Sequence, residues 1–235
     1  MANAIAVLRV LEREGGIRLA DKADFVAGHS LGEYTALCAA GAFDLATAAK
    51  LLRTRGDAMQ AAVPVGVGAM AAILGADREK AQAIADAAAE GQVCTVANDN
   101  DPSQVVISGH REAIERALLL PVSAPFHCPL MQPAADAMAA ALAAVSLQAP
   151  LVPVYANVTA APVADPDTIR ALLVEQVTGM VRWRESVLAM FAAGGTDYVE
   201  FGGKGLGGMV KRIAPDAAPV SVVTMEDIEA LAKAL

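Results

Sequence analysis

A serine between two glycines is the first feature of this sequence that could do chemistry. Ser30 lies in the run GHSLG, residues 28–32, which fits a G-x-S-x-G pattern. Enzymes that use this pattern place the serine on a sharp turn between a strand and a helix, which lifts its oxygen clear of the backbone. The flanking runs DFVA and LGEYTALCAA supply such a strand and helix. We therefore predict that Ser30 is a nucleophile rather than a packing serine, with the N–H of Leu31 as an oxyanion donor.

A serine nucleophile needs a base, and the sequence offers three histidines. His29 is adjacent to the serine in a tight turn, where neighbouring side chains rarely meet. His110 opens a polar helix, on which we expect it to face solvent. His127 lies in SAPFHCPLM between two prolines, which restrict the backbone there. His127 is thus the best candidate for the base, and a structural histidine in the core is the alternative.

One arginine is placed on an inward face. The spacing of apolar residues over 43–63 predicts a helix, with Arg55 at the edge of its buried stripe and Lys50 and Arg53 pointing away. A buried charge without a partner is costly, so Arg55 needs an anion. That anion is either one of the protein's own carboxylates or a carboxylate of the substrate, held by two parallel hydrogen bonds.

The elements that must position these side chains alternate between strands and helices. This order predicts an α/β fold in which helices cover both faces of a mostly parallel sheet. Residues 65–124 have a different order, β-α-β-β-α-β, which is the ferredoxin-like pattern. We therefore predict a large subdomain from residues 1–64 and 125–235, into which residues 65–124 are inserted as a small subdomain.

One connection in the small subdomain is too short. The helical run HREAIERA meets the strand-like run LLLPVSA at Ala117–Leu118 with no turn between them. A helix needs a few residues to reverse into a packed strand. We expect either that the helix is clipped or that residues are missing from the sequence at this join.

Composition limits the classes of function. The chain has 235 residues, of which 55% are hydrophobic and 19% charged, enough to bury a sizeable core. A formal net charge of −8 argues against nucleic acid as a general partner. The three cysteines are widely spaced and form no zinc pattern with the histidines, which favours reduced thiols, no metal and a cytoplasmic protein. No signal peptide or membrane-spanning run is visible.

A second glycine-rich run imitates a cofactor motif. Gly203, Gly205 and Gly208 in GGKGLGG form a G-x-G-x-x-G after a predicted strand, and Glu226 follows the next strand. Few residues follow Glu226, too few for the rest of a nucleotide-binding half. We expect a tight strand–helix turn here and no bound cofactor.

Several runs together resemble one known family. They are GHSLGEYTAL, RGDAMQ, GAMAAILG, SQVVISGH, LPVSAPFHCPLMQPA and GGKGLGGMVKR. In this order they resemble the malonyl-CoA:acyl carrier protein transacylases of bacterial fatty acid synthesis, and the acyltransferase domains of polyketide synthases are close relatives. The resemblance implies a hydrolase-like α/β core with an inserted ferredoxin-like subdomain. It also implies ping-pong transfer of malonyl from coenzyme A, through a serine, to the phosphopantetheine thiol of a carrier protein.

The resemblance assigns roles to residues by position. Ser30 resembles the family's nucleophile, His127 its base, and Arg55 the arginine that binds the malonyl carboxylate. Gln176, in VEQVTG, resembles the residue whose backbone carbonyl orients the histidine in place of a triad acid.

Three further residues follow from the same resemblance. Leu31 resembles one oxyanion donor, Asn98 in VANDN an asparagine near the active site, and Phe126 the malonyl-selective rather than the methylmalonyl-selective pattern. The sequence also departs from the family in two places. It starts after the family's first strand and its G-Q-G-S-Q loop, whose glutamine N–H completes the oxyanion hole, and it has fewer residues at Ala117–Leu118.

The sequence therefore predicts an acyl carrier protein S-malonyltransferase of fatty acid synthesis. Its substrates would be malonyl-CoA and acyl carrier protein, without a further cofactor. The alternatives are a polyketide-type acyltransferase, a serine esterase or lipase, and an inactive docking module for carrier protein. An esterase needs a triad acid and an apolar acyl pocket, and it leaves the inward arginine unexplained. Because carrier proteins are acidic, docking would use a basic patch, for which the candidates are Arg182, Arg184, Lys204, Lys211 and Arg212.

Overall fold

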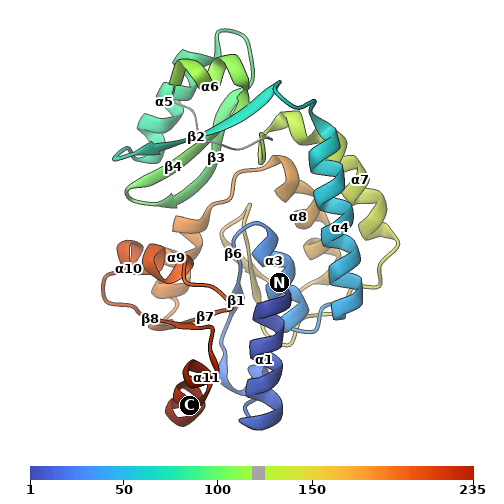
Figure 1. The fold of residues 1–235 in the computed structure, drawn as a ribbon, viewed down its shortest axis with the longest axis vertical. Coiled ribbons are helices and arrows are strands. Elements are labelled where there is room, and N and C mark those ends of the chain that lie inside the picture. The colour runs from blue at the N-terminus through green and yellow to red at the C-terminus, as the bar shows by residue number, and fades with distance from the viewer. Residues whose placement is uncertain (118–124) are drawn as a thin grey trace.

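The computed structural model describes residues 1–117 and 125–235, so the strand predicted at 118–124 lies outside the described residues. In this described part the strands form three small sheets within an α/β arrangement (Figure 1). The first has the order β1-β5-β6, the second β2-β4-β3, and the third β7-β8. Their bounds are β1 Val26–Ala27, β2 Gly68–Leu74, β3 Cys94–Asp101, β4 Gln104–His110, β5 Val154–Ala156, β6 Ala161–Val163, β7 Asp197–Phe201 and β8 Ala218–Val222.

Several helices begin at a capping side chain. Asp44 accepts a hydrogen bond from Thr47 N and starts α4, and Asp77 starts α5 in the same way by accepting from Lys80 N. No helix among the described residues is long and apolar enough to cross a membrane. The helices are α1 Ala2–Glu14, α2 Leu19–Lys22, α3 Leu31–Ala39, α4 Leu45–Ala62, α5 Arg78–Ala89, α6 Arg111–Ala117, η1 Pro129–Met131, α7 Gln132–Ala143, α8 Pro166–Thr178, α9 Trp183–Ala192, α10 Leu206–Ile213 and α11 Met225–Ala234.

The described part of the predicted small subdomain contains the antiparallel sheet β2-β4-β3. Alternate residues of its strands face α5 and α6, where alanines dominate the core; Ala69 and Ile107 on the strands pack there against Ala81 and Ala85 of α5. The opposite face carries Met70, Ala97 and Val106 and meets Phe126. This is the strand order of three of the four strands in a ferredoxin-like unit.

The predicted large subdomain contains two parallel strand pairs, β1–β5 and β7–β8. The two pairs are not hydrogen-bonded to each other among the described residues, and β6 joins β5 in antiparallel fashion. The single, mostly parallel sheet predicted from the sequence is therefore divided into separate small sheets among the described residues. The alternation of strands and helices indicates parallel pairing, but it does not indicate which strands are neighbours. Both pairs still contribute to one apolar cluster, which includes Tyr155 of β5 and Tyr198 of β7.

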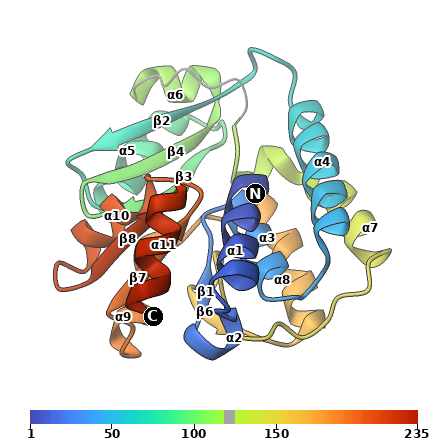
Figure 2. The same cartoon turned by 60° about the horizontal axis from the view of Figure 1, so that its bottom comes forward.

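Helices cover the remaining apolar surfaces. A cluster formed by α3, α4, α7 and α8 includes Tyr34, Leu51, Met138 and Leu173, and it supports the helices that carry the candidate site. Near the chain ends, α1 packs on β7 and α11 packs on β8 (Figure 2), and Leu11 of α1 and Leu231 of α11 share one apolar cluster.

The two subdomains are joined through β3. Asp99 N donates to Val181 O at 2.9 Å, and Val181 N donates to Ala97 O at 2.8 Å. Arg184 of α9 binds the Asp99 carboxylate through both Nε and Nη2, and Arg212 of α10 binds Asp101 in the same region. Both aspartates are fully buried. These ion pairs fix the small subdomain on the α9–α10 side of the large one.

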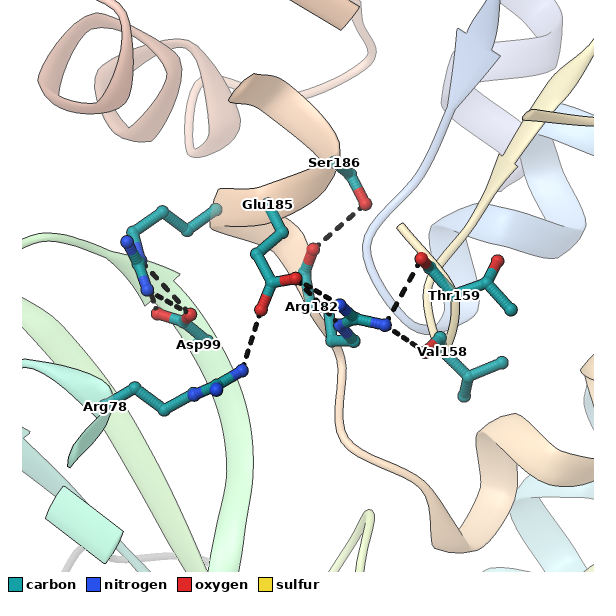
Figure 3. A network of polar contacts seen from close by, with 8 residues as sticks. Arg78, Asp99, Val158, Thr159, Arg182, Glu185 and Ser186 are labelled. Carbon is teal, nitrogen blue, oxygen red and sulfur yellow. Dashed lines mark hydrogen bonds and ion pairs between the residues drawn. The ribbon is translucent and has the colours of Figure 1, made fainter. Parts of the chain in front are cut away.

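A second set of charges strengthens this contact (Figure 3). Glu185 of α9 lies between Arg78 of the small subdomain, at 2.8 Å, and Arg182 of its own subdomain. Arg182 also donates to the carbonyl oxygens of Val158 and Thr159, at 3.2 Å each. The network thus ties α5 to the loop that follows β5.

We expect Arg184→Ala to lower the free energy of unfolding by about 2–4 kcal/mol, because it leaves the Asp99 carboxylate buried without its cation. Urea unfolding of the variant and the wild type measures the difference. Arg53→Ala is the matched control, since Arg53 is exposed and pairs only at the surface with Asp57. Equal losses for the two variants would contradict a stabilising role for the Asp99 pair.

Candidate active site

Ser30 sits on a strained turn between β1 and α3. Its φ of 52° and ψ of −108° lie in a region that non-glycine residues rarely adopt. The turn brings the backbones of Gly28 and Gly32 together so closely that a Cβ on Gly28 would lie 2.0 Å from Gly32 carbonyl atoms. The first glycine of the pattern is therefore required by the turn, as expected for a nucleophile elbow.

His127 is placed directly against the serine. Its Nε2 lies 2.7 Å from Ser30 Oγ, and its Nδ1 lies 2.8 Å from the backbone oxygen of Gln176. A carbonyl only accepts, so Nδ1 carries the proton and Nε2 is free to accept the serine O–H. Burial, helped by the charge of Arg55, lowers the pKa of His127 to about 3. The imidazole is therefore neutral and able to act as a base.

Arg55 reaches the same serine oxygen from α4. Its Nη2 donates to Ser30 Oγ at 3.0 Å and to the Gln176 side-chain oxygen, Oε1, at 3.1 Å. The side chain is only 6% exposed, and its guanidinium lies over the Tyr34 ring at 5.7 Å. No described carboxylate lies within ion-pair distance of it. The nearby Glu33 carboxylate acts on Arg55 through space without forming an ion pair with it.

A buried polar cluster of Glu33, Asn157 and Gln176 holds the turn at Ser30 through hydrogen bonds. Glu33 Oε2 accepts from Asn157 N at 2.9 Å and from Gln176 Nε2 at 2.7 Å. Asn157 in turn holds the elbow on both sides of the serine, by accepting from Ser30 N and donating to Gly28 O. The cluster therefore links the nucleophile, the histidine and the arginine in one network.

Neither Glu33 nor Asn157 was predicted from the sequence to be a site residue. A glutamate three residues after a serine, at the start of a helix, commonly lies at the protein surface. In the structure Ser30 makes no capping hydrogen bond, and Glu33 points into the core at 2% exposure. The local sequence signal for the burial of Glu33 is its position next to Tyr34 and Leu37, which form the buried side of α3.

Glu33 predicts an unusual dependence of stability on pH. Burial raises the pKa of its carboxyl from 4.5 to about 7, against the lowering effect of the hydrogen bonds from Asn157 and Gln176. Between these two values the unfolded chain has lost a proton that the folded chain keeps, so this group makes the fold less stable as pH rises. Above the folded-state pKa the loss is complete.

We expect Glu33→Gln to remove this contribution. On going from about pH 5 to about pH 8, the variant should gain about 2–3 kcal/mol in free energy of unfolding relative to the wild type. Urea unfolding at the two pH values gives the difference, and comparing differences cancels any constant effect of the substitution. Glu12→Gln on the exposed face of α1 is the control. The same pH dependence in Glu33→Gln and wild type would contradict the assignment.

The other predicted site residues, Leu31, Phe126 and Asn98, do not belong to the hydrogen-bond network around Ser30. Leu31 is the first residue of α3, and no described residue accepts its N–H, as an oxyanion donor requires. Phe126 precedes His127 and packs against both apolar clusters that meet there. Asn98 is buried on β3 and pairs with Val181. It is Asn100, two residues further on, whose side chain meets the elbow.

That contact runs through His29. Asn100 Oδ1 lies 2.8 Å from His29 Nε2, and Asn100 Nδ2 donates to Gln104 Oε1. His29 also lies beside Trp183, with ring centroids 5.8 Å apart. As expected, His29 does not hydrogen-bond to Ser30. It instead connects the elbow to the small subdomain.

Backbone N–H groups of the glycine-rich run at 202–208 are hydrogen-bonded to a side chain of the protein itself. The carboxylate of Glu200 accepts from the N–H groups of Gly205, Leu206 and Gly207 at the start of α10. These are the groups that would hold a phosphate in a dinucleotide site. Among the described residues, no group of three or more His, Cys, Asp or Glu side chains is placed to hold a metal ion.

Most of the basic residues considered for docking have partners within the chain. Arg182, Arg184 and Arg212 form the ion pairs described above, and Lys211 donates to Ala217 O at 3.0 Å. These contacts hold the two predicted subdomains and the turn after α10 together. Most side chains of the predicted basic patch therefore bind groups of the same chain.

Comparison with known proteins places the site in a family. The acyl transferase domain family matches residues 4–202. The chain is 46% identical to the malonyl CoA-acyl carrier protein transacylase of Escherichia coli K12, over 91% of this chain and 72% of that protein. It is 41% identical to the protein of the same name from Bacillus subtilis, over 97% of this chain and 75% of that protein.

Solved structures agree. The acyl-carrier-protein S-malonyltransferase of Bartonella henselae superposes with a TM-score of 0.95 at 49% identity, over 99% of this chain and 78% of that one. A malonyl-transacylase solved in complex with AntF, a type II polyketide synthase acyl carrier protein, superposes with a TM-score of 0.94 at 37% identity, over 100% of this chain and 79% of that one.

The match to the acyl transferase domain family covers most of the chain, including Ser30, Arg55 and His127, so the chain is an acyl transferase by family. Identity to the curated relatives over more than two thirds of their length narrows the class. The chain belongs to the malonyl CoA-acyl carrier protein transacylase family.

Proposed function

We propose that this chain transfers malonyl from malonyl-CoA to the phosphopantetheine thiol of acyl carrier protein, in fatty acid synthesis. The observation that carries the proposal is the convergence of two groups on one oxygen. His127 Nε2 and Arg55 Nη2 lie 2.7 Å and 3.0 Å from Ser30 Oγ. A base and a cation at a nucleophile suit acyl transfer of an anionic acyl group.

The first half-reaction acylates the serine. Ser30 Oγ attacks the thioester carbonyl as its proton passes to His127 Nε2, and the Gln176 carbonyl stabilises the imidazolium that forms. Leu31 N–H donates to the oxyanion. When the new O–C bond has formed and the C–S bond breaks, His127 returns the proton to the leaving coenzyme A sulfur. The product is malonyl-Ser30 and a free thiol.

The second half-reaction runs the same steps in reverse with a different thiol. His127 takes the proton of the phosphopantetheine thiol as its sulfur attacks malonyl-Ser30. The C–S bond forms, the O–C bond breaks, and the proton returns to Ser30 Oγ. No oxidant, metal or further cofactor takes part in either half of this proposal.

Selection of the acyl group follows from the same residues. Arg55 binds the terminal carboxylate, so diacids are preferred over simple acyl groups. Phe126 borders His127 with an apolar ring, and we propose that it favours malonyl over its methylated analogue. Asn98 stays a weaker proposal, because the β3 residue that contacts the elbow through His29 is Asn100, two residues further along the strand.

Acyl carrier protein is the proposed acceptor. A relative with the same fold has been solved with its carrier protein, which supports this partner. We propose a cytoplasmic location, where malonyl-CoA is available. We also propose that the parallel pairs β1–β5 and β7–β8 belong to one hydrolase-like core, because they share an apolar cluster.

The proposal is tested by comparing transfer with hydrolysis. Malonyl-CoA is incubated with the protein, with and without holo acyl carrier protein, and malonyl-carrier protein and free malonate are both measured. We expect malonyl-carrier protein to form much faster than malonate. Malonate as the main product in both arms would favour an esterase, and no turnover with retained carrier binding would favour an inactive docking module.

A further inference from the structure

Arg55 engages the nucleophile itself in this structure. Its Nη2 donates one hydrogen bond to Ser30 Oγ and another to Gln176 Oε1. A terminal guanidinium nitrogen carries two N–H groups, so both donors of Nη2 are in use. The Nε of Arg55 is buried and has no partner among the described residues. It is therefore closed to an incoming ligand.

A carboxylate needs some of these donors. Bidentate binding takes one N–H from each of two guanidinium nitrogens. Because Nε is closed off, the edge that a substrate carboxylate can reach is formed by Nη1 and Nη2 of Arg55. Nη2 must then release one of the two oxygens that it holds.

The two oxygens are not equally easy to release. The Gln176 side chain is fully buried, and its Nε2 is fixed by Glu33 Oε2 at 2.7 Å and Ser30 O at 3.0 Å. Its Oε1 therefore has no freedom to turn away from Arg55. Ser30 Oγ belongs to a half-buried residue and keeps a second partner, His127 Nε2, when the arginine leaves. The serine oxygen is the one that the carboxylate displaces.

We propose that Arg55 is a latch on the nucleophile as well as a clamp for the substrate. Without a carboxylate it occupies Ser30 Oγ, and the carboxylate of the acyl group frees that oxygen for attack. The proposal rests on the malonyl transfer proposed above. It makes the diacid faster to react, as well as tighter to bind, because the substrate itself opens the latch.

Two consequences of carboxylate binding act in the same direction. Ser30 Oγ regains a lone pair that a cationic donor was using, which makes it a better nucleophile. The charge of Arg55 also lowers the pKa of His127, together with burial, so a neutralised arginine leaves a stronger base. An acyl group without a carboxylate obtains neither effect.

Formate added to acetyl-CoA tests the latch. Acetyl has no carboxylate, and formate supplies one separately, so together they present the groups of malonyl. The rate constant for acetylation of Ser30 is measured at saturating acetyl-CoA by quenched intact-protein mass spectrometry. Sodium formate is compared with sodium chloride at equal ionic strength. We expect formate to raise the rate constant about 10-fold with saturation, the value of one hydrogen bond to a charged group.

Variants on α4 provide the controls. Arg55→Gln should lose the response to formate. Arg53→Gln, on the exposed side of the same helix, should keep the full response. The main comparison uses the wild type, so it stands even if Arg55→Gln does not fold.

The outcomes separate the latch from the function on which it rests. Malonyl labelling of the wild type with unchanged or slower acetylation in formate would overturn the latch alone. Absence of malonyl labelling would overturn the proposed transfer and the latch together.

Discussion

Replacing Ser30 by alanine should lower kcat for malonyl transfer by about 10⁴-fold or more, because the side chain supplies the atom that bonds to the acyl group. Transfer is measured by the formation of malonyl-carrier protein under saturating malonyl-CoA. The substitution keeps the fold, since the strain of the turn is in the backbone and alanine adds no atoms. Urea unfolding of the variant confirms that a folded protein was assayed.

Ser146→Ala is the matched control for this change. Ser146 is exposed beyond the end of α7, and its hydroxyl contacts only the Gln148 side chain among the described residues. We expect wild-type rates for this variant. If Ser30→Ala retained more than about a tenth of wild-type activity, the nucleophile would have to be another residue.

Replacing Arg55 by alanine should change which acyl group the protein prefers. We expect kcat/KM for malonyl-CoA to fall by about 10²–10³-fold, because a bidentate ion pair in a buried site is lost. The acetyl-CoA value should fall much less or rise, since acetyl offers nothing to the guanidinium. The ratio of the two values in parallel assays measures the change in specificity.

Arg53→Ala tests whether any loss of positive charge from α4 has this effect. Arg53 is exposed and paired with Asp57, two residues before Arg55 on the same helix. It should leave the malonyl-to-acetyl ratio unchanged. Equal losses of kcat/KM for malonyl-CoA and acetyl-CoA in Arg55→Ala would contradict this account. They would show that the arginine supports the fold or the serine and does not bind the substrate carboxylate.

Local features of the fold could be predicted from the sequence because their causes are local. The strands β2, β3 and β4 follow from short apolar runs between turn residues, and α4 and α5 follow from helical spacing after a capping aspartate. The short helix α2, strand β6 and the C-terminal helix α11 were not predicted. The first two have too few residues for a periodic signal.

The elbow and its base could also be predicted, for a physical reason. Gly28 and Gly32 mark a close backbone approach, and prolines on both sides of His127 mark a restricted segment. Both signals lie within a few residues of the side chain that they position. The position of Arg55 followed in the same way from the periodicity of its helix.

Contacts between distant segments could not be predicted. Asp99 meets Arg184 across 85 positions, and Glu33 meets Gln176 across 143. From the sequence, Arg184 was a candidate for a basic docking patch, and Glu33 was not singled out. The resemblance pointed to Asn98, whereas the asparagine that contacts the elbow through His29 is Asn100. Only the assembled fold decides which polar groups share a buried space.

Mass spectrometry of the intact protein after mixing with malonyl-CoA tests the central claim most directly. We predict one covalent malonyl group per chain, located on the peptide that contains Ser30 and removed when holo acyl carrier protein is added. No adduct, or an adduct on any other residue that survives in Ser30→Ala, would contradict the account.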